Sequence, residues 1–202
     1  GVQTVDVTDP DAGAAFDAAI EARGALRGLV NCAGIGTAAR IVGREGPMDL
    51  AAFERVIRVN LIGTFNMMRL AAARMAGNDP DAGGARGAIV NTASVGALIA
   101  DPNMSVYCAM KHAVSGLTKA AAVEYAQQGI RVNCVAPGFV RTPMTQHWAD
   151  SKDFTDMFFQ HNISGRYAHP EEIAGTVLHL CSDAASFVNG ATWTIDGGQT
   201  AH

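Results

Sequence analysis

The sequence predicts an α/β protein: a Rossmann-like doubly wound parallel sheet with helices on both faces. Two observations predict this fold. Short apolar runs of strand length alternate along the chain with longer segments in which apolar residues recur at helical spacing. The short runs are almost continuously apolar, as strands are when both faces of their sheet are covered. Strands connected through helices lie parallel, so their carboxyl ends meet at one edge, where such sheets bind ligands.

Each predicted strand ends at residues that turn the chain. The first alternates polar and apolar residues and stops at Asp9-Pro10, the third leads into Ser94, and the fourth is broken by Pro137-Gly138. The second runs directly into a turn that contains glycine, and the last into Asp-Gly-Gly. The predicted strands are residues 3–8, 29–32, 88–93, 130–135 and 192–195.

The predicted helices have recognisable beginnings. Asp9-Pro10 caps and opens the first, and Pro170 with two acidic residues opens the last. The helix from Leu50 carries apolar residues on more than one face, so we expect it to be covered on two sides in a homo-oligomer, a tetramer built on two-fold contacts. The predicted helices are residues 10–23, 50–75, 105–128 and a helix from 170; a glycine-rich insertion at 77–87 and an aromatic-rich segment at 142–167 lie between them.

Length and composition indicate one globular domain over residues 1–202. With 17% charged residues and a net charge of −4, the chain lacks the basic footprint of a protein that binds nucleic acid. No apolar run approaches the roughly 20 residues that cross a membrane, and the first residues do not resemble a signal peptide. We therefore expect a cytoplasmic protein with neither nucleic acid nor membrane as a partner. The four cysteines lie scattered in apolar stretches, which predicts reduced core thiols, and the histidines lack metal-ligand spacing.

Tyr107 and Lys111 lie four residues apart in a predicted helix, so they share one face and are separated by about 6 Å along its axis. A nearby ammonium favours the phenolate, so we expect the pKa of Tyr107 to be lowered. Lowering it by about three would need roughly 4 kcal/mol, so we expect a second positive charge nearby. The alternative is an ordinary pair on a helix face. The neighbours decide between the two, because Gly34, Ser94 and Gly138 are predicted to line one crevice at the carboxyl edge of the sheet.

The chain resembles the short-chain dehydrogenase/reductases over essentially its whole length. The family's motifs occur in the family's order: Asn31-Cys-Ala-Gly34, Asn60, Ser94, Tyr107-x-x-x-Lys111 and Pro137-Gly138. The family carries Asn-Asn-Ala-Gly at the first of these positions, and Cys32 here replaces the second asparagine. Up to about Val95, and including the insertion at 77–87, the sequence is most similar to the type-2 3-hydroxyacyl-CoA dehydrogenases; beyond Val95 it resembles the family in general.

The resemblance implies four catalytic residues. Tyr107 would be the general acid/base, and Lys111 would lower its pKa while holding the nicotinamide ribose, with an oxidised nicotinamide ring as the second positive charge. Ser94 would hydrogen-bond the substrate oxygen. Asn60 would hold the water that links Lys111 to solvent. The alternative for Asn60 is an asparagine that only disturbs its helix locally.

The resemblance also implies NAD or NADP as the cofactor. Asp6 would accept a hydrogen bond from the adenine amino group, with Val7 offering backbone atoms; alternatively, Asp6 only caps the following helix. The Val140 backbone and the Thr142 hydroxyl would meet the nicotinamide carboxamide. The implied cofactor-binding residues are Asp6, Val7, Asn31, Ala33, Gly34, Thr92, Tyr107, Lys111, Pro137, Gly138, Val140 and Thr142.

The predicted substrate pocket is mainly apolar and suits a hydrophobic ketone or alcohol, such as a 3-hydroxyacyl or steroid-like compound. Ile99 and the segment 144–161, with Met157 and Phe158, are expected around it. The alternative is that these aromatic residues pack the core or a subunit contact. The substrate residues that we predict are Ser94, Val95, Met104, Phe139 and Trp148.

These features predict an NAD(P)-dependent oxidoreductase that interconverts a secondary alcohol and a ketone, with no metal. The family's Gly-x-x-x-Gly-x-Gly turn, which binds the pyrophosphate after the first strand, does not precede Gly1. We therefore expect the natural polypeptide to extend upstream, with this numbering beginning at the third strand. The alternative function is a catalytically inactive fragment or relative that acts through oligomerisation.

Overall fold

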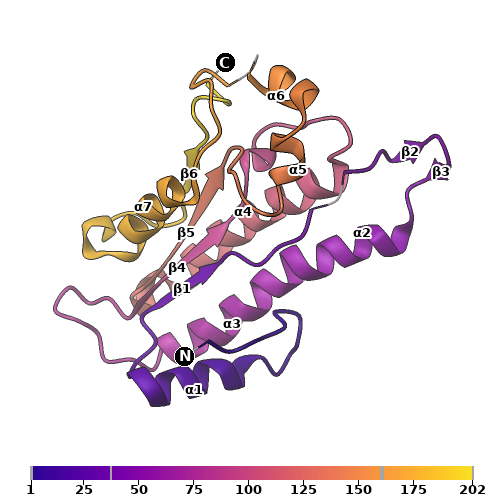
Figure 1. Cartoon of the computed structure of the whole chain (residues 1–202). Helices are drawn as coiled ribbons and strands as arrows, with labels where there is room; N and C mark the ends of the chain where they lie inside the picture. The colour runs from indigo at the N-terminus through magenta and orange to yellow at the C-terminus, as the bar shows by residue number, and fades with distance from the viewer. Residues whose placement is uncertain (1, 37, 160–161, 202) are drawn as a thin grey trace.

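The computed structural model describes residues 2–36, 38–159 and 162–201. In this part of the chain, four parallel strands form one sheet in the order β1-β4-β5-β6. Figure 1 shows α7 on one side of this sheet and α3 and α4 on the other, so the predicted Rossmann-like α/β fold with helices on both faces is confirmed. The strands are β1 (Gly28–Asn31), β4 (Gly87–Thr92), β5 (Ile130–Pro137) and β6 (Thr192–Ile195).

Two apolar clusters hold the helices on the sheet, one on each face. Neighbouring residues of a strand point to opposite faces, so Ile89 of β4 packs with α1, α3 and α4, while Val90 packs with Leu180 of α7. Each of these side chains is fully buried, which stabilises the fold by about 1.5 to 3 kcal/mol per residue. The helices concerned are α1 (Gly13–Arg23), α3 (Gly63–Met75), α4 (Ser105–Tyr125) and α7 (Pro170–Cys181).

Shorter elements fill the connections. A two-stranded hairpin, which the sequence analysis missed, occupies the loop before the long helix and turns at Gly46, whose φ is 114°. None of the helices in the described ranges is long and apolar enough to cross a membrane. These elements are β2 (Val42–Gly43), β3 (Gly46–Pro47), α2 (Leu50–Ile57), α5 (Gln146–Ala149), α6 (Lys152–Phe159) and 3₁₀ turns at Val95–Ala97, Ala126–Gln128 and Asp183–Ala185.

The predicted strand at residues 3–8 is wrong. The carbonyl oxygens of Val7 and Asp9 accept hydrogen bonds from the side-chain amide of Asn66, at 2.9 and 2.7 Å. These bonds attach the end of the segment to helix α3. The carboxylate of Asp6 accepts hydrogen bonds from the amide and hydroxyl of Thr8, which turns the chain. Side-chain partners thus take the place of a neighbouring strand.

Two predicted helices also differ from the structure. The first begins at Gly13 rather than Pro10, because the intervening residues form turns that include the bond from the Ala12 amide to the Asp9 carbonyl. The predicted helix at 50–75 is interrupted by a π-helical turn at Arg58–Ile62, in which the Gly63 amide bonds the Arg58 carbonyl. A π-helical turn of this kind places one extra residue in the helix.

The glycine-rich insertion is attached to the start of β5 at Gly129. This residue has φ 73°, and its carbonyl accepts hydrogen bonds from the amides of Arg86 (2.7 Å) and Gly87 (3.4 Å). A Cβ at this position would overlap the carbonyl oxygen of Gly84, which is backbone and cannot rotate away. Both the backbone angle and the close approach therefore require glycine.

Gly129→Ala is expected to lower the free energy of unfolding by about 2 to 4 kcal/mol, since the left-handed conformation and the overlap both oppose a side chain. Gly116→Ala is the matched control, because Gly116 lies exposed inside α4 with nothing within 4 Å of its Cβ position. Alanine there should raise stability by up to about 1 kcal/mol. Urea denaturation measures both, and equal effects of the two substitutions would contradict this account.

Candidate active site

The exits of β1, β4 and β5 lie at one edge of the sheet. The register places Asn31, Asn91, Cys134 and Thr192 side by side across the four strands. The segments that leave the strands just beyond this row carry the predicted crevice residues. The parallel topology therefore gathers these segments as expected.

Ser94, Tyr107 and Lys111 form one cluster at this edge. Helix α4 begins at Ser105, so its first two turns lie over the end of β4. Lys111 is only 8% exposed, and its Nζ donates a 2.7 Å hydrogen bond to the carbonyl of Thr92. The same Nζ lies 5.6 Å from the centre of the Tyr107 ring. Ser94 is buried, accepts a 3.2 Å hydrogen bond from the Gly96 amide and shares a side-chain hydrogen bond with the Tyr107 phenol.

The expected lowering of the Tyr107 pKa is wrong for this arrangement. Burial raises the pKa of the phenol above its ordinary value; the hydrogen bond with Ser94 acts in the opposite direction, and Cys108 adds to the increase. The helical spacing indicated the attraction between ammonium and phenolate, but not how much water both groups lose. Desolvation by burial therefore exceeds the favourable interactions.

Burial also lowers the pKa of Lys111, from 10.5 to about 8, because the ammonium is removed from water. The thiols of Cys134 and Cys32 act in the opposite direction. Cys32 itself is exposed, so the expectation that every cysteine lies in the core is wrong here. It follows the end of β1, and its Sγ lies 3.7 Å from the hydroxyl of Thr92.

Asn60 connects the long helix to the segment that leaves β1. Its buried side chain donates to the Ile35 carbonyl (2.7 Å) and accepts from the Ile35 amide (2.8 Å). A Cβ at Gly34 would lie 3.3 Å from its Oδ1, so a glycine permits this close approach. The Asn60 carbonyl accepts the Thr64 hydroxyl at 2.8 Å within the π-helical turn. Asn60 therefore lies in the π-helical turn of its helix and also binds the segment that follows β1.

The other predicted cofactor residues of the first half lie around these elements. Asp6 is exposed, and hydrogen bonds from the amide and the hydroxyl of Thr8 lower its pKa. Val7 packs so closely on Gly63 that a Cβ there would overlap its side chain. Ala33 is exposed immediately after β1, next to Cys32. Asp6 and Val7 are therefore held beside the helix that carries Asn60.

The segment that leaves β5 is held by a turn. Gly138 donates to the Ile195 carbonyl at 3.0 Å, and a Cβ on it would come within 2.9 Å of the Asp196 backbone. Val140 forms a bridge with Ala168 that uses the neighbouring Arg141 amide and Phe139 carbonyl, so the Val140 amide points the other way.

The sequence analysis missed Thr145, which organises this turn. Its hydroxyl donates to the Val140 carbonyl (2.6 Å), accepts from the Thr142 amide (2.9 Å) and lies 3.0 Å from the Thr142 hydroxyl. The signal was available, because threonines three residues apart after a strand favour such side-chain turns.

The aromatic residues after β5 pack against one another. The Phe139 ring centre lies 6.4 Å from that of Trp148, 5.4 Å from Phe158 and 4.8 Å from Tyr167. The Tyr167 hydroxyl lies 2.8 Å from that of Thr155. These contacts are consistent with the alternative that Phe158 packs in the protein core and does not contact the substrate. The side chain of Met157 and residues 160–161 lie outside the described part of the chain.

Three of the residues predicted to surround the substrate lie in the segment between the end of β4 and the start of α4. Val95 is buried and Ile99 and Met104 are partly buried. Asn103, the one non-glycine residue with positive φ (69°) among the described residues, accepts a 2.8 Å hydrogen bond from the Ala39 amide. Sequence reasoning missed this connection, which places the segment after β1 beside the start of α4.

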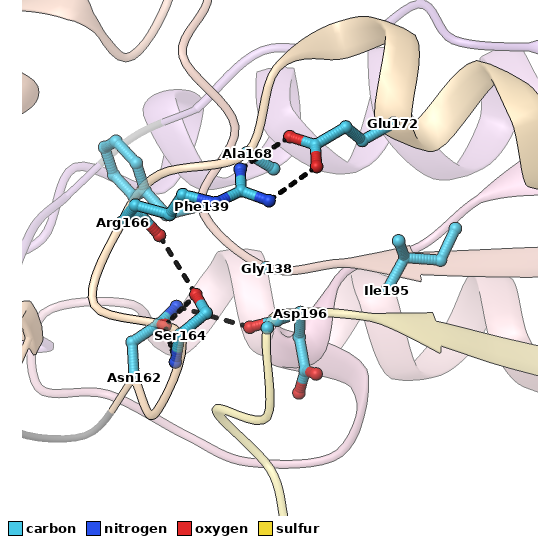
Figure 2. Close-up of a pocket in the computed structure, with 10 residues that line it drawn as sticks. Gly138, Phe139, Asn162, Ser164, Arg166, Ala168, Glu172, Ile195 and Asp196 are labelled. Carbon is cyan, nitrogen blue, oxygen red and sulfur yellow. Dashed lines mark hydrogen bonds and ion pairs between the residues drawn. The ribbon is translucent and has the colours of Figure 1, made fainter.

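A cavity of about 100 Å³ is lined by Gly138 and Phe139 together with residues after α6 and β6. Figure 2 shows Arg166 paired with Glu172 on one side of it and Asn162, Ser164 and Asp196 on the other. The two Arg166–Glu172 bonds measure 2.8 and 2.7 Å and help to lower the pKa of Glu172 to about 2. Neither Ser94, Tyr107 nor Lys111 lines this cavity, so it supports the β5 exit rather than forming the reaction site.

Comparison with known proteins identifies relatives over nearly the whole chain. Residues 2–200 match the family model described as enoyl-(acyl carrier protein) reductase. The chain is 40% identical to the short-chain dehydrogenase fogB of Aspergillus ruber, over 99% of this chain and 76% of that protein. It is 39% identical to the 3-hydroxyacyl-CoA dehydrogenase type-2 of Bos taurus, over 95% of this chain and 74% of that protein.

A solved structure agrees with these sequence matches. The gluconate 5-dehydrogenase of Burkholderia cenocepacia, crystallised with NADP and tartrate, is similar to this chain with a TM-score of 0.87 and 33% identity. The similarity covers 98% of this chain and 74% of the other. Sequence and architecture therefore indicate the same set of relatives.

The buried lysine should make stability depend on pH. Between its folded pKa of about 8 and the ordinary 10.5 the unfolded chain binds more protons, so stability should rise with pH. From about pH 7.5 to about pH 9.5 this contribution is about 2 kcal/mol. Urea denaturation should show it as a difference in pH slope between the parent protein and Lys111→Met, since titrating groups distant from Lys111 contribute equally to both proteins. Parallel slopes would contradict the burial effect.

Proposed function

The chain belongs to the short-chain dehydrogenase/reductase family, oxidoreductases that act on CH–OH groups, and from this premise we propose that it interconverts a secondary alcohol and a ketone with NAD or NADP. The observation that carries the proposal is the cluster of Ser94, Tyr107 and Lys111 at the carboxyl edge of the sheet. A phenol, a hydroxyl and an ammonium at this edge provide what proton transfer to a carbonyl oxygen requires.

The residues at this edge fit a nicotinamide dinucleotide. Lys111 has three donors, and among the described residues it uses one, on the Thr92 carbonyl. The others suit a ribose diol, which would give the buried ammonium further partners. Gly34 and Gly138 let the β1 and β5 exits pack closely on Asn60 and Asp196, and the outward Val140 amide and the Thr142 hydroxyl suit a carboxamide. When bound, the cofactor supplies or accepts the hydride.

Tyr107 is the proposed general acid/base. Its raised pKa keeps the phenol protonated at neutral pH, so its Oη holds the proton that a ketone oxygen needs during reduction. In the oxidation direction the phenol first releases its proton to solvent, and the resulting phenolate oxygen receives the alcohol proton. The nearby Lys111 ammonium stabilises this phenolate.

Ser94 and Asn60 are proposed to assist Tyr107. Because Ser94 shares a hydrogen bond with the phenol, both hydroxyls can address one substrate oxygen. We assign Asn60 to the return of protons from solvent towards Lys111, through a water held in the π-helical turn. Its side-chain bonds to Ile35 hold that turn in place.

The proposed substrate is a hydrophobic ketone or secondary alcohol. Val95 and Met104 lie between β4 and α4, and Phe139 and Trp148 pack against each other after β5. These apolar groups favour a 3-hydroxyacyl or steroid-like compound over a polyhydroxylated one.

We also propose assembly as a homotetramer. A hollow of about 450 Å³ lies along α2 and the π-helical turn, lined by apolar side chains together with Glu54, Arg55 and Arg58, and Phe65 further along is 48% exposed. Val56 and Met68 of the same helical stretch are buried on the inner side. Apolar residues on both sides suit a helix that a second copy covers.

Tyr107→Phe should lower kcat for ketone reduction by at least about 10² to 10⁴, because it removes the proton donor and one oxygen atom. The measurement is steady-state reduction with NADH and with NADPH. Turnover within a few-fold of the parent protein would contradict the assignment.

Two controls accompany this variant. Its urea midpoint and its dinucleotide affinity by calorimetry should stay close to those of the parent, which separates lost chemistry from lost structure. Phe187→Ala, at a fully exposed site, should leave kcat unchanged. A folded parent protein that binds a dinucleotide but turns over no ketone or alcohol would instead favour the association-only alternative.

The substrate class predicts an order of kcat/KM across a panel of carbonyl compounds. Bulky cyclic and long-chain ketones should exceed polyhydroxylated ketones by about tenfold or more, since the latter would leave hydroxyls without partners against apolar walls. Trp148→Ala should reduce this preference. Sugars turned over best, with hydrophobic ketones inert, would overturn the assignment.

A further inference from the structure

A continuous chain of buried hydrogen bonds runs beneath the Tyr107 cluster. The Asn31 side chain donates to Asn91 Oδ1 at 2.9 Å, and Asn91 Nδ2 donates to the Thr118 hydroxyl at 3.0 Å. The Thr118 hydroxyl in turn donates to the Val114 carbonyl at 2.9 Å. Asn91 and Thr118 are fully buried, and Asn31 is 9% exposed. The direction of each bond is therefore fixed from β1 through β4 into α4.

The chain joins the three elements that carry the proposed site. Asn31 ends β1 just before the Gly34 turn, Asn91 precedes Ser94 on the exit of β4, and Thr118 lies on α4. Thr118 follows Lys111 by seven residues, which is two turns of helix, so both side chains reach the sheet from the same helix face. Lys111 meets the Thr92 carbonyl, and Thr118 meets the adjacent residue of the same strand.

Apolar packing and hydrogen bonds both hold α4 near this contact. The cluster between α4 and the strands here consists of small residues such as Ala93, Val114 and Cys134. When a helix shifts slightly, each contact between small apolar side chains changes little in energy. A hydrogen bond, in contrast, weakens within a few tenths of an ångström. The Thr118–Asn91 bond therefore adds a second directional constraint between α4 and β4, two helical turns beyond the Lys111–Thr92 bond.

Thr118 leaves Asn91 little choice of partner. The hydroxyl donates its proton to the Val114 carbonyl and accepts from Asn91 Nδ2, and the Cys134 side chain is a further neighbour. Among the described residues, Asn91 Nδ2 also contacts the Met68 sulfur at 3.8 Å, which is a weak acceptor. Without the Thr118 oxygen, the amide would have to turn or the helix would have to move.

We propose that Thr118 is a positioning residue for the reaction: through Asn91 it sets the place of α4 on β4 and with it the contact between Tyr107 and Ser94. The inference rests on the proposed function for its effect on turnover, but the contact itself is measurable without turnover. An error of about 1 Å between reacting groups lowers rates by up to about 10².

The test compares Thr118→Val, which keeps the shape and removes the hydroxyl, with Thr118→Ser, which keeps the hydroxyl. Ser115→Ala is the matched control, because the Ser115 hydroxyl lies on the same helix but pairs with Thr192 of β6 at 2.8 Å. Thr118→Val should lower kcat about tenfold with little change in KM for the dinucleotide. Thr118→Ser should restore kcat to within about twofold, and Ser115→Ala should leave it unchanged.

A second measurement does not depend on activity. The Tyr107 phenol can be titrated by its ultraviolet absorbance, with Tyr107→Phe subtracted to remove the other tyrosines. The hydrogen bond with Ser94 lowers the pKa of Tyr107, whereas burial and Cys108 raise it. If Thr118→Val weakens the Ser94 bond, Tyr107 should titrate at higher pH in this variant. Ser115→Ala should leave the titration unchanged. Should Thr118→Val fail to fold, Thr118→Cys, with a weaker acceptor, should show the same shift in part.

The two measurements separate the two ideas. A titration shift in a protein that turns over no ketone would support the positioning role and count against the proposed function. An unshifted titration, together with equal kcat in Thr118→Val and Ser115→Ala, would show that Thr118 only fills space, and would overturn the inference.

Discussion

The hydrogen bond from the Lys111 ammonium to the Thr92 carbonyl is the interaction on which the arrangement of this edge depends. A lysine that is 8% exposed loses most of its hydration, so the protein must bring an oxygen to it. That oxygen belongs to the last residue of β4, which forces the first turns of α4 to lie over the strand end. Tyr107, one turn earlier, then comes beside Ser94. The position of the Tyr107 phenol therefore follows from the need of the buried Lys111 ammonium for a hydrogen-bond acceptor.

The rest of the fold lets this contact form without strain. Alanines at positions 71, 72, 121 and 122 keep α3 and α4 close to the sheet and to each other. The segment after β1 is fixed from both sides, by Asn60 at Ile35 and by Asn103 at Ala39. Long-range polar contacts thus secure the loops, while small apolar residues secure the layers. The combination provides a rigid frame around a partly buried phenol.

Features with a local signal in the sequence could be predicted, and features decided by distant partners could not. The strand at 192–195 and the helix from Ser105 follow from apolar periodicity and turn residues. The predicted strand at 3–8 is not formed: the Val7 carbonyl at its end bonds Asn66, about 60 positions away. The π-helical turn at Asn60 and the raised pKa of Tyr107 depend in the same way on tertiary contact and burial. Thr118 carries no local mark that distinguishes it from any helical threonine.

The insertion at residues 77–87 lies at the opposite edge of the sheet from Tyr107. Arg27 holds the carbonyls of Asp79 and Ala85, and Gly129 holds the strand that follows, so its anchors all belong to the amino ends of strands. Between those anchors the tip around Gly83 faces solvent. The tip is therefore a suitable place to insert a reporter peptide or an immobilisation tag, which would leave the Tyr107 edge of the sheet facing away from the support.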